Sequence, residues 1–262
     1  MSTLYNTIGD GYNTTRNADP YITQILLQLL TPVSDGKYMD IGCGTGNYTI
    51  AMHEQGVNIC GADPSHKMLT IANSRNPDIT WLPYTAEDIN AAPESLNGIT
   101  GVLTIHHWAS ITTAFYRLCA LLKPGGKIVL FTSSPEQMRS YWLNHYFPHM
   151  MELSIQQMPD IMTIEHAAQA AGLELTDYVP YTVTDTLQDY FLYAGKNKPE
   201  LYFDESVRHG ISSFAALSNR EEVMQGLSQL DTDIRSDTFQ KVKDNYAHDG
   251  SDYIFLVLTK KQ

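Results

Sequence analysis

Apolar and polar positions follow two different periods along this chain. Between residues 20 and 31 the apolar residues Ile22, Ile25, Leu26, Leu29 and Leu30 recur at helical spacing, with Asp19 placed to cap the first turn. This pattern predicts a helix over 20–31. The same criteria, with turn residues at the ends, predict further helices over 47–55, 65–74, 108–122 and 163–171.

Short apolar runs between these helices predict strands. They lie at 37–41, 57–63, 79–84, 98–105 and 127–133, followed by an extended stretch at 173–184 and a terminal strand at 253–259. The sequence LKPGG at 122–126 indicates a turn before the fifth strand. Strands that alternate with helices at this spacing favour βαβ units and an open parallel sheet.

The regular alternation ends near residue 135. We predict an α/β core made of 1–135, 163–185 and 250–262, and two insertions, 136–162 and 186–249, that form a cap before the last strand. The aromatic and methionine-rich stretch 139–154 is typical of a packed helix or of an apolar wall over a pocket.

Three glycines follow the first predicted strand, in the sequence DIGCGTGNYT at 40–49. Glycine lacks a Cβ and permits positive φ, so a ligand can approach the backbone closely. The helix that follows offers unpaired N–H groups at its N-terminus. Asp63 ends the second predicted strand, beside the glycine turn in a doubly wound fold, where a carboxylate can accept both hydroxyls of a ribose. Together these features predict a nucleoside-bearing cofactor, although Asp63 also suits a helix cap.

The composition of the chain limits the classes of molecule that it is expected to bind. The chain has 262 residues and a net charge of −12, without a cluster of lysine and arginine, which disfavours nucleic acid. No apolar run is long enough to span a membrane, and the N-terminus does not resemble a signal peptide. Three scattered cysteines are typical of reduced thiols. We therefore expect a cytoplasmic protein with a small-molecule partner, and the oligomeric state stays open.

The glycine spacing bears on the cofactor. The turn reads GxGxG, and Asn47 stands where the dinucleotide fingerprint GxGxxG has its third glycine. The carboxylate of Asp40, at the start of the turn, disfavours a pyrophosphate. S-adenosylmethionine carries no phosphate, and its ammonium and sulfonium groups suit acidic and aromatic neighbours.

DIGCGTGNYT resembles the first motif of class I S-adenosylmethionine-dependent methyltransferases. Four later segments resemble their following motifs in the right order: GADPS at 61–65, YTAEDIN at 84–90, LTIHHW at 103–108 and LLKPGGKIVL at 121–130. The resemblance spans 38–131 and is similar to the small-molecule branch, of the ubiquinone-biosynthesis and trans-aconitate types. It implies a Rossmann-like, doubly wound, mostly parallel seven-stranded sheet with helices on both faces, and S-adenosylhomocysteine as a product.

The resemblance also implies cofactor contacts. Gly42, Cys43 and Gly44 are expected along the methionine portion, with Asp40 holding the loop or contacting the ammonium. Asp63 is expected on the ribose, and the adenine and the floor of the site are expected to contact Pro64, Met68, Ala86, Glu87, Asp88, Thr104 and Ile105.

Two segments are candidates for acceptor or cofactor contacts. In the N-terminal stretch, Tyr12 suits an aromatic wall or hydroxyl near the sulfonium, with a catalytic role in view, and Arg16 suits the cofactor carboxylate or an ion pair with Asp10 or Asp19. After the fourth strand, His106 or His107 is placed to act as a base, or to pack architecturally.

The sequence therefore predicts an enzyme that transfers a methyl group from S-adenosylmethionine to a small molecule, without a metal. Three alternatives stay open: an NAD(P)-dependent oxidoreductase, a non-catalytic S-adenosylmethionine-binding module, and a protein methyltransferase. The identity of the acceptor, and whether its oxygen, nitrogen, carbon or sulfur is methylated, do not follow from the residues.

Overall fold

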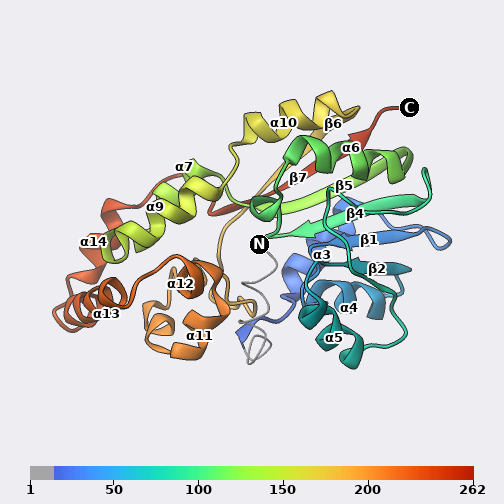
Figure 1. The fold of residues 1–262 in the computed structure, drawn as a ribbon. Helices are drawn as coiled ribbons and strands as arrows, with labels where there is room; N and C mark the ends of the chain where they lie inside the picture. The colour runs from blue at the N-terminus through green and yellow to red at the C-terminus, as the bar shows by residue number, and fades with distance from the viewer. Residues whose placement is uncertain (1–14) are drawn as a thin grey trace.

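A seven-stranded sheet with helices on both faces forms the larger part of the molecule (Figure 1). The computed structural model describes residues 15–262. The strands are β1 (Tyr38–Ile41), β2 (Ile59–Ala62), β3 (Trp81–Leu82), β4 (Leu96–Val102), β5 (Leu122–Thr132), β6 (Leu173–Tyr181) and β7 (Tyr253–Lys260). Their spatial order is β3-β2-β1-β4-β5-β7-β6, with β1 to β5 parallel and β7 antiparallel to both neighbours. The predicted fold class is confirmed.

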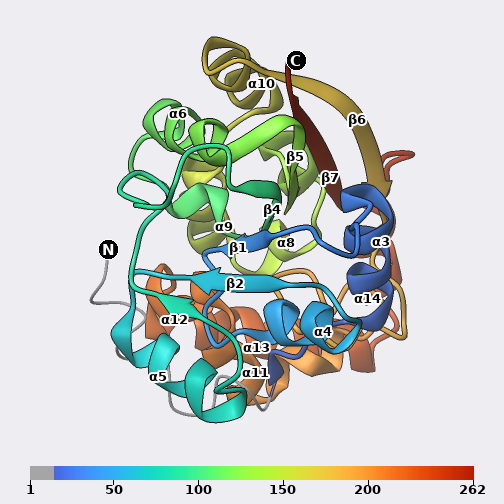
Figure 2. The same cartoon turned by 90° about the vertical axis from the view of Figure 1, so that its right-hand side faces the viewer.

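Alternating residues of the central strands supply two cores. Along β5, Val129 and Phe131 pack into one cluster and Ile128 and Leu130 into the other. Helices α6 (Ile111–Leu121) and α10 (Ile161–Ala170) cover one face, and α3 (Pro20–Leu30), α4 (Asn47–Glu54) and α5 (His66–Arg75) lie on the other (Figure 2). The continuous apolar strands of the sequence therefore reflect burial on both faces.

The helices begin where the sequence places their caps. The Asp19 carboxylate accepts hydrogen bonds from the backbone N–H groups of Tyr21 and Ile22 at the start of α3. Ser65 and Ser110 cap α5 and α6 in the same way. Each side chain satisfies a donor that the first helical turn leaves unpaired.

Two predicted boundaries were wrong. The segment 122–126 is not a turn before β5 but its first part, because Leu122 pairs with Leu96 and the register then shifts so that Lys127 pairs with Gly98. The backbone of Gly125, at φ 76°, accommodates this irregularity. Helix α6 begins at Ile111 rather than at 108, because Ser110 caps its first turn, and residues Ile105–His107 form a separate 3-10 turn, η1.

The segments predicted as a cap contain the remaining helices, which lie together at one end of the molecule (Figure 1). These are α7 (Pro135–Arg139), α8 (Leu143–Tyr146), α9 (Pro148–Gln157), η2 (Pro199–Phe203), α11 (Glu205–Gly210), α12 (Ser212–Ala216), α13 (Arg220–Arg235) and α14 (Phe239–Asn245). Helix α12 packs against α9 and α13 against α8, so the two segments form one layer. The division of the chain into core and cap stays a prediction.

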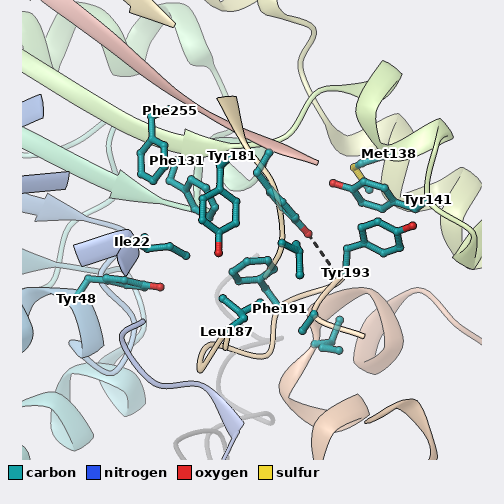
Figure 3. Close-up of a cluster of buried hydrophobic side chains, with 14 of the residues drawn as sticks. Ile22, Tyr48, Phe131, Met138, Tyr141, Tyr181, Leu187, Phe191, Tyr193 and Phe255 are labelled. Atoms are coloured by element: carbon teal, nitrogen blue, oxygen red, sulfur yellow. Dashed lines mark hydrogen bonds between the residues drawn. The ribbon is translucent and has the colours of Figure 1, made fainter. Parts of the chain in front are cut away.

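Aromatic side chains join this cap layer to the sheet (Figure 3). The Tyr141 ring stacks on the Tyr193 ring with centroids 3.9 Å apart, and the Tyr193 amide donates to the hydroxyl of Tyr253 on β7. Phe131 and Phe191 continue the cluster toward the sheet.

In the part of the chain that the structure describes, no helix has both the length and the apolar character to cross a membrane.

Candidate active site

The glycine turn follows β1 and opens α4. Gly42, Gly44 and Gly46 all have positive φ, at 71°, 54° and 78°. A side chain at Gly42 would place its Cβ 1.9 Å from the Thr104 hydroxyl oxygen, and one at Gly46 would lie 2.4 Å from the Trp81 ring. A Cβ at Gly44 would meet nothing within 4 Å. Two of the glycines are therefore required by packing inside the protein, and Gly44 is the one that faces open space.

A cavity of about 540 Å³ lies outside the carboxyl ends of the parallel strands and includes this turn. That position is where open α/β sheets bind ligands. The residues of the sequence prediction that line the cavity are Arg16, Asp40, Gly42, Cys43, Gly44, Asp63, Pro64, Met68, Ala86, Glu87, Thr104, His106 and His107. The loops after four successive strands of the sheet therefore meet at one site.

Asp63 fixes the glycine turn against the second strand. One carboxylate oxygen accepts from the Gly44 amide at 2.9 Å and the other from the Ser65 amide at 2.8 Å. Burial raises the pKa of Asp63, and the two amide hydrogen bonds oppose that shift. Each carboxylate oxygen has a second acceptor site, so the side chain can hold the turn and still accept a ligand hydroxyl.

Asp40 lies buried below the turn. Its carboxylate accepts from the Thr49 hydroxyl at 2.6 Å and from the Thr100 hydroxyl at 3.2 Å. Burial raises the pKa of Asp40 to about 6, while these hydrogen bonds lower it. The side chain therefore ties the end of β1 to α4 and β4, and its contact with the cofactor ammonium stays a prediction.

The predicted adenine contacts divide into two groups. Ala86 and Glu87 line the cavity, and the Glu87 carboxylate accepts from the Ser110 amide at 3.1 Å. Asp88 and Ile105 are not among the residues that line it, and their contact with the cofactor stays a prediction. The Asp88 carboxylate instead closes its own loop on the Thr85 amide and hydroxyl, and Ile105 is buried in the core beside α6 and α10.

Arg16 joins the N-terminal segment to the cap. Its Nε and Nη2 donate to the two carboxylate oxygens of Asp189, and Nη1 donates to the Gly210 carbonyl at 3.2 Å. The Tyr48 hydroxyl donates to Asp189 at 3.1 Å. Among the described residues, the ion-pair partner of Arg16 is Asp189 and not Asp19, and cofactor contact by Arg16 stays a prediction. Tyr12 and Asp10 lie outside the described residues.

His106 and His107 stand at the cavity wall with ring centroids 3.9 Å apart. The Nδ1 atom of His106 is buried and has no hydrogen-bond partner among the described residues. Burial lowers the pKa of both imidazoles, well below the usual value for His106, whose neighbour His107 adds to the shift, and to about 4 for His107. Both rings are therefore neutral at pH 7.

The sequence did not single out most of the cap side of the cavity. Ser133, Met138, Met158, Leu192 and Ile211 line it, and their spacing carries no motif. The aromatic and methionine-rich stretch was the available signal, and it contributes Ser154, while the cap segment after residue 186 contributes Phe191. Among residues 15–262, no three His, Cys, Asp or Glu side chains gather in a way that would hold a metal ion.

Comparison with known proteins identifies the family and the fold. A family model described as a methyltransferase domain matches residues 14–178. A crystal structure of a methyltransferase ascribed to an antibiotic biosynthesis pathway of Anabaena variabilis is similar with a TM-score of 0.83 and 29% identity, over 94% of this chain and 99% of that one.

Curated relatives share shorter segments. A biotin biosynthesis bifunctional protein from Cellvibrio japonicus is 26% identical over 61% of this chain and 32% of its own length. A ubiquinone biosynthesis O-methyltransferase from Agrobacterium fabrum is 31% identical over 36% of this chain and 40% of its own length. The chain therefore spans less than half the length of these relatives. With the family model covering most of the chain, and with the glycine turn, Asp63 and strand order in place, this protein belongs to the class I S-adenosylmethionine-dependent methyltransferases.

Proposed function

We propose that this protein transfers a methyl group from S-adenosylmethionine to a small-molecule acceptor held between the sheet and the cap. The single observation that carries the proposal is the cavity that joins the glycine turn and Asp63 to the cap-side wall. One end has the features of a nucleoside site, and the other is lined by residues such as Met158, Leu192 and Ile211.

The residues at the glycine turn fit the cofactor. Gly44 faces open space where a side chain would project, and the Asp63 carboxylate beside it keeps acceptor capacity for ribose hydroxyls. Pro64 and Met68 offer apolar surface for adenine, with Ala86 and Glu87 at its edge. When bound, S-adenosylmethionine supplies a sulfonium-activated methyl group, which passes to the acceptor while the carbon–sulfur bonding pair stays on sulfur.

The protein's own contribution is to orient the acceptor and to exclude water. Cap residues close one side of the cavity, and the loops after the strands close the other. His106 and His107 are proposed to contact the acceptor as neutral imidazoles. A neutral imidazole carries a lone pair for an acceptor proton, and the lowered pKa limits each ring to a weak base.

A small acceptor is favoured by the shape of the site. The cavity lies between two layers of the fold, and its volume is within the usual range for small-molecule pockets. A dinucleotide oxidoreductase is disfavoured because Gly46, in the turn, is packed against Trp81 and the position after it is Asn47. A non-catalytic module that only binds S-adenosylmethionine would need no space for an acceptor beside the turn, so the cavity also disfavours that alternative.

The test is transfer of labelled methyl from S-adenosylmethionine into a pool of small metabolites by the purified protein. We expect label in a small-molecule product that depends on the intact protein. Label recovered only in added protein, or S-adenosylmethionine binding without any transfer, would contradict the proposal.

A further inference from the structure

Apart from the Arg16–Asp189 ion pair, the described residues on the cap side of the cavity carry no formal charge. Its apolar surface comes from side chains such as Met138, Met158, Phe191, Leu192 and Ile211. Its polar groups are neutral: the hydroxyls of Ser133, Ser154, Ser212 and Ser213 and the amide of Gln157. Among the described residues, a ligand in this half of the cavity therefore meets neutral hydrogen-bonding groups and no unpaired ion.

The cation at the cavity is already engaged. Among the described residues that line the cavity, the only lysine or arginine is Arg16. Its guanidinium binds the Asp189 carboxylate and the Gly210 carbonyl. Residues 1–14, which lie outside the described part of the chain, contain one carboxylate, Asp10, and no lysine or arginine in their sequence. The neighbouring histidines are neutral at pH 7 because burial lowers the pKa of both.

The carboxylates of the cavity lie in the cofactor half or in the Arg16 pair. Asp40 is held by Thr49 and Thr100, Asp63 by backbone amides, and Asp189 by Arg16 and Tyr48. Glu87 stands at the loop before α6. Of these carboxylates, Asp189 alone lies in a cap segment, and it is paired with Arg16.

From this distribution we infer that the acceptor is an uncharged molecule with an apolar body and one or more hydroxyl or carbonyl groups. An ionised group loses its hydration on entering the cavity, and this wall returns no opposite charge to compensate. Hydroxyl and carbonyl groups exchange water for serine and glutamine partners with little loss. The inference rests on the proposed function and narrows it: free carboxylates, phosphates and ammonium compounds are excluded as acceptors.

The test separates acceptors by charge before the reaction. A metabolite extract is divided into an anion-exchange-retained pool, a cation-exchange-retained pool and a flow-through pool, and each is incubated with the protein and methyl-labelled S-adenosylmethionine. We expect at least tenfold more incorporation from the flow-through pool. Incorporation chiefly from either retained pool overturns the inference while leaving methyl transfer intact.

A pair of variants tests the wall itself. Met158→Lys places a cation at the cap side, and Met162→Lys makes the same change at an exposed site on α10. We expect the first to lower transfer into the flow-through pool at least tenfold with S-adenosylmethionine affinity retained, and the second to change neither. Equal transfer by both variants overturns the inference. Failure of the wild-type protein to bind S-adenosylmethionine in calorimetry is a separate result that overturns the proposed function itself.

Discussion

A glycine can be required by its backbone conformation or by contact with a ligand, and substitutions can distinguish the two requirements. Gly44 and Gly56 both have positive φ, and a Cβ at either position would meet nothing within 4 Å, but Gly44 alone lines the cavity. Gly44→Ala and Gly56→Ala should each lower the free energy of unfolding by about 1–2 kcal/mol, because alanine is strained in the left-handed region.

Their ligand affinities should differ. Gly44→Ala is expected to weaken S-adenosylhomocysteine binding at least tenfold in calorimetry, since its methyl group projects into the site, and Gly56→Ala should leave the affinity unchanged. Equal affinity in both variants would show that Gly44 does not contact the cofactor.

A second prediction concerns Asp40. The raised pKa of its carboxyl group decides whether this residue stabilises or destabilises the fold at a given pH. Burial raises the pKa from 3.8 to about 6, so the folded state holds its proton more tightly than the unfolded state. Stability from this group is present at low pH and is lost as pH rises toward 6, which costs about 3 kcal/mol above that value.

Asp40→Asn should therefore raise the free energy of unfolding of the ligand-free protein at pH 8, and about half of that gain should disappear at pH 5. Urea denaturation at the two pH values measures the effect. A gain that is independent of pH would show that Asp40 is ionised in the folded protein throughout this range.

The paired histidines are predicted to act on the acceptor rather than on the cofactor. His106→Ala and His107→Ala should each lower turnover with a saturating acceptor by more than they lower S-adenosylmethionine affinity. Steady-state kinetics and calorimetry measure the two effects. Wild-type turnover in both variants would leave these residues with a packing role only.

At the scale of elements, one buried ion pair joins three parts of the fold. Arg16 precedes α3, Asp189 lies in the segment after β6, and Tyr48 lies on α4. The side chain of Asp189 is 2% exposed and that of Arg16 is 13% exposed. Removing one partner of a buried pair leaves the other charge without compensation.

Arg16→Leu should accordingly lower the free energy of unfolding by about 3–5 kcal/mol. The matched control is Arg235→Leu, whose pair with Asp231 is exposed on α13 and should contribute less than about 1 kcal/mol. Denaturant titration of both variants provides the comparison, and similar losses would mean that the Arg16 contact does not secure the cap to the sheet.

At the scale of the whole molecule, the sequence predicted what local patterns encode. Apolar periodicity and caps placed the strands and helices in order, and the topology of parallel strands brought Gly44, Asp63 and Glu87 to one edge. The sequence did not reveal that the Asp88 carboxylate closes on the backbone of its own loop, and cofactor contact by Asp88 stays a prediction.

The residues on the cap side of the cavity could not be predicted from local sequence patterns. The Arg16–Asp189 pair joins residues 173 positions apart, and Ser133, Phe191 and Ile211 reach the cavity only through the packing of distant segments. No spacing in the chain marks such residues, because their common position is a property of the tertiary structure.

Calorimetric titration of S-adenosylmethionine, compared with NADH, tests the central claim most directly. The account predicts binding of one S-adenosylmethionine per chain, no binding of NADH, and a loss of about 1–3 kcal/mol in Asp63→Ala but not in the exposed control Asp78→Ala. Preferential binding of NADH, or equal S-adenosylmethionine affinity in Asp63→Ala and the wild-type protein, would contradict it.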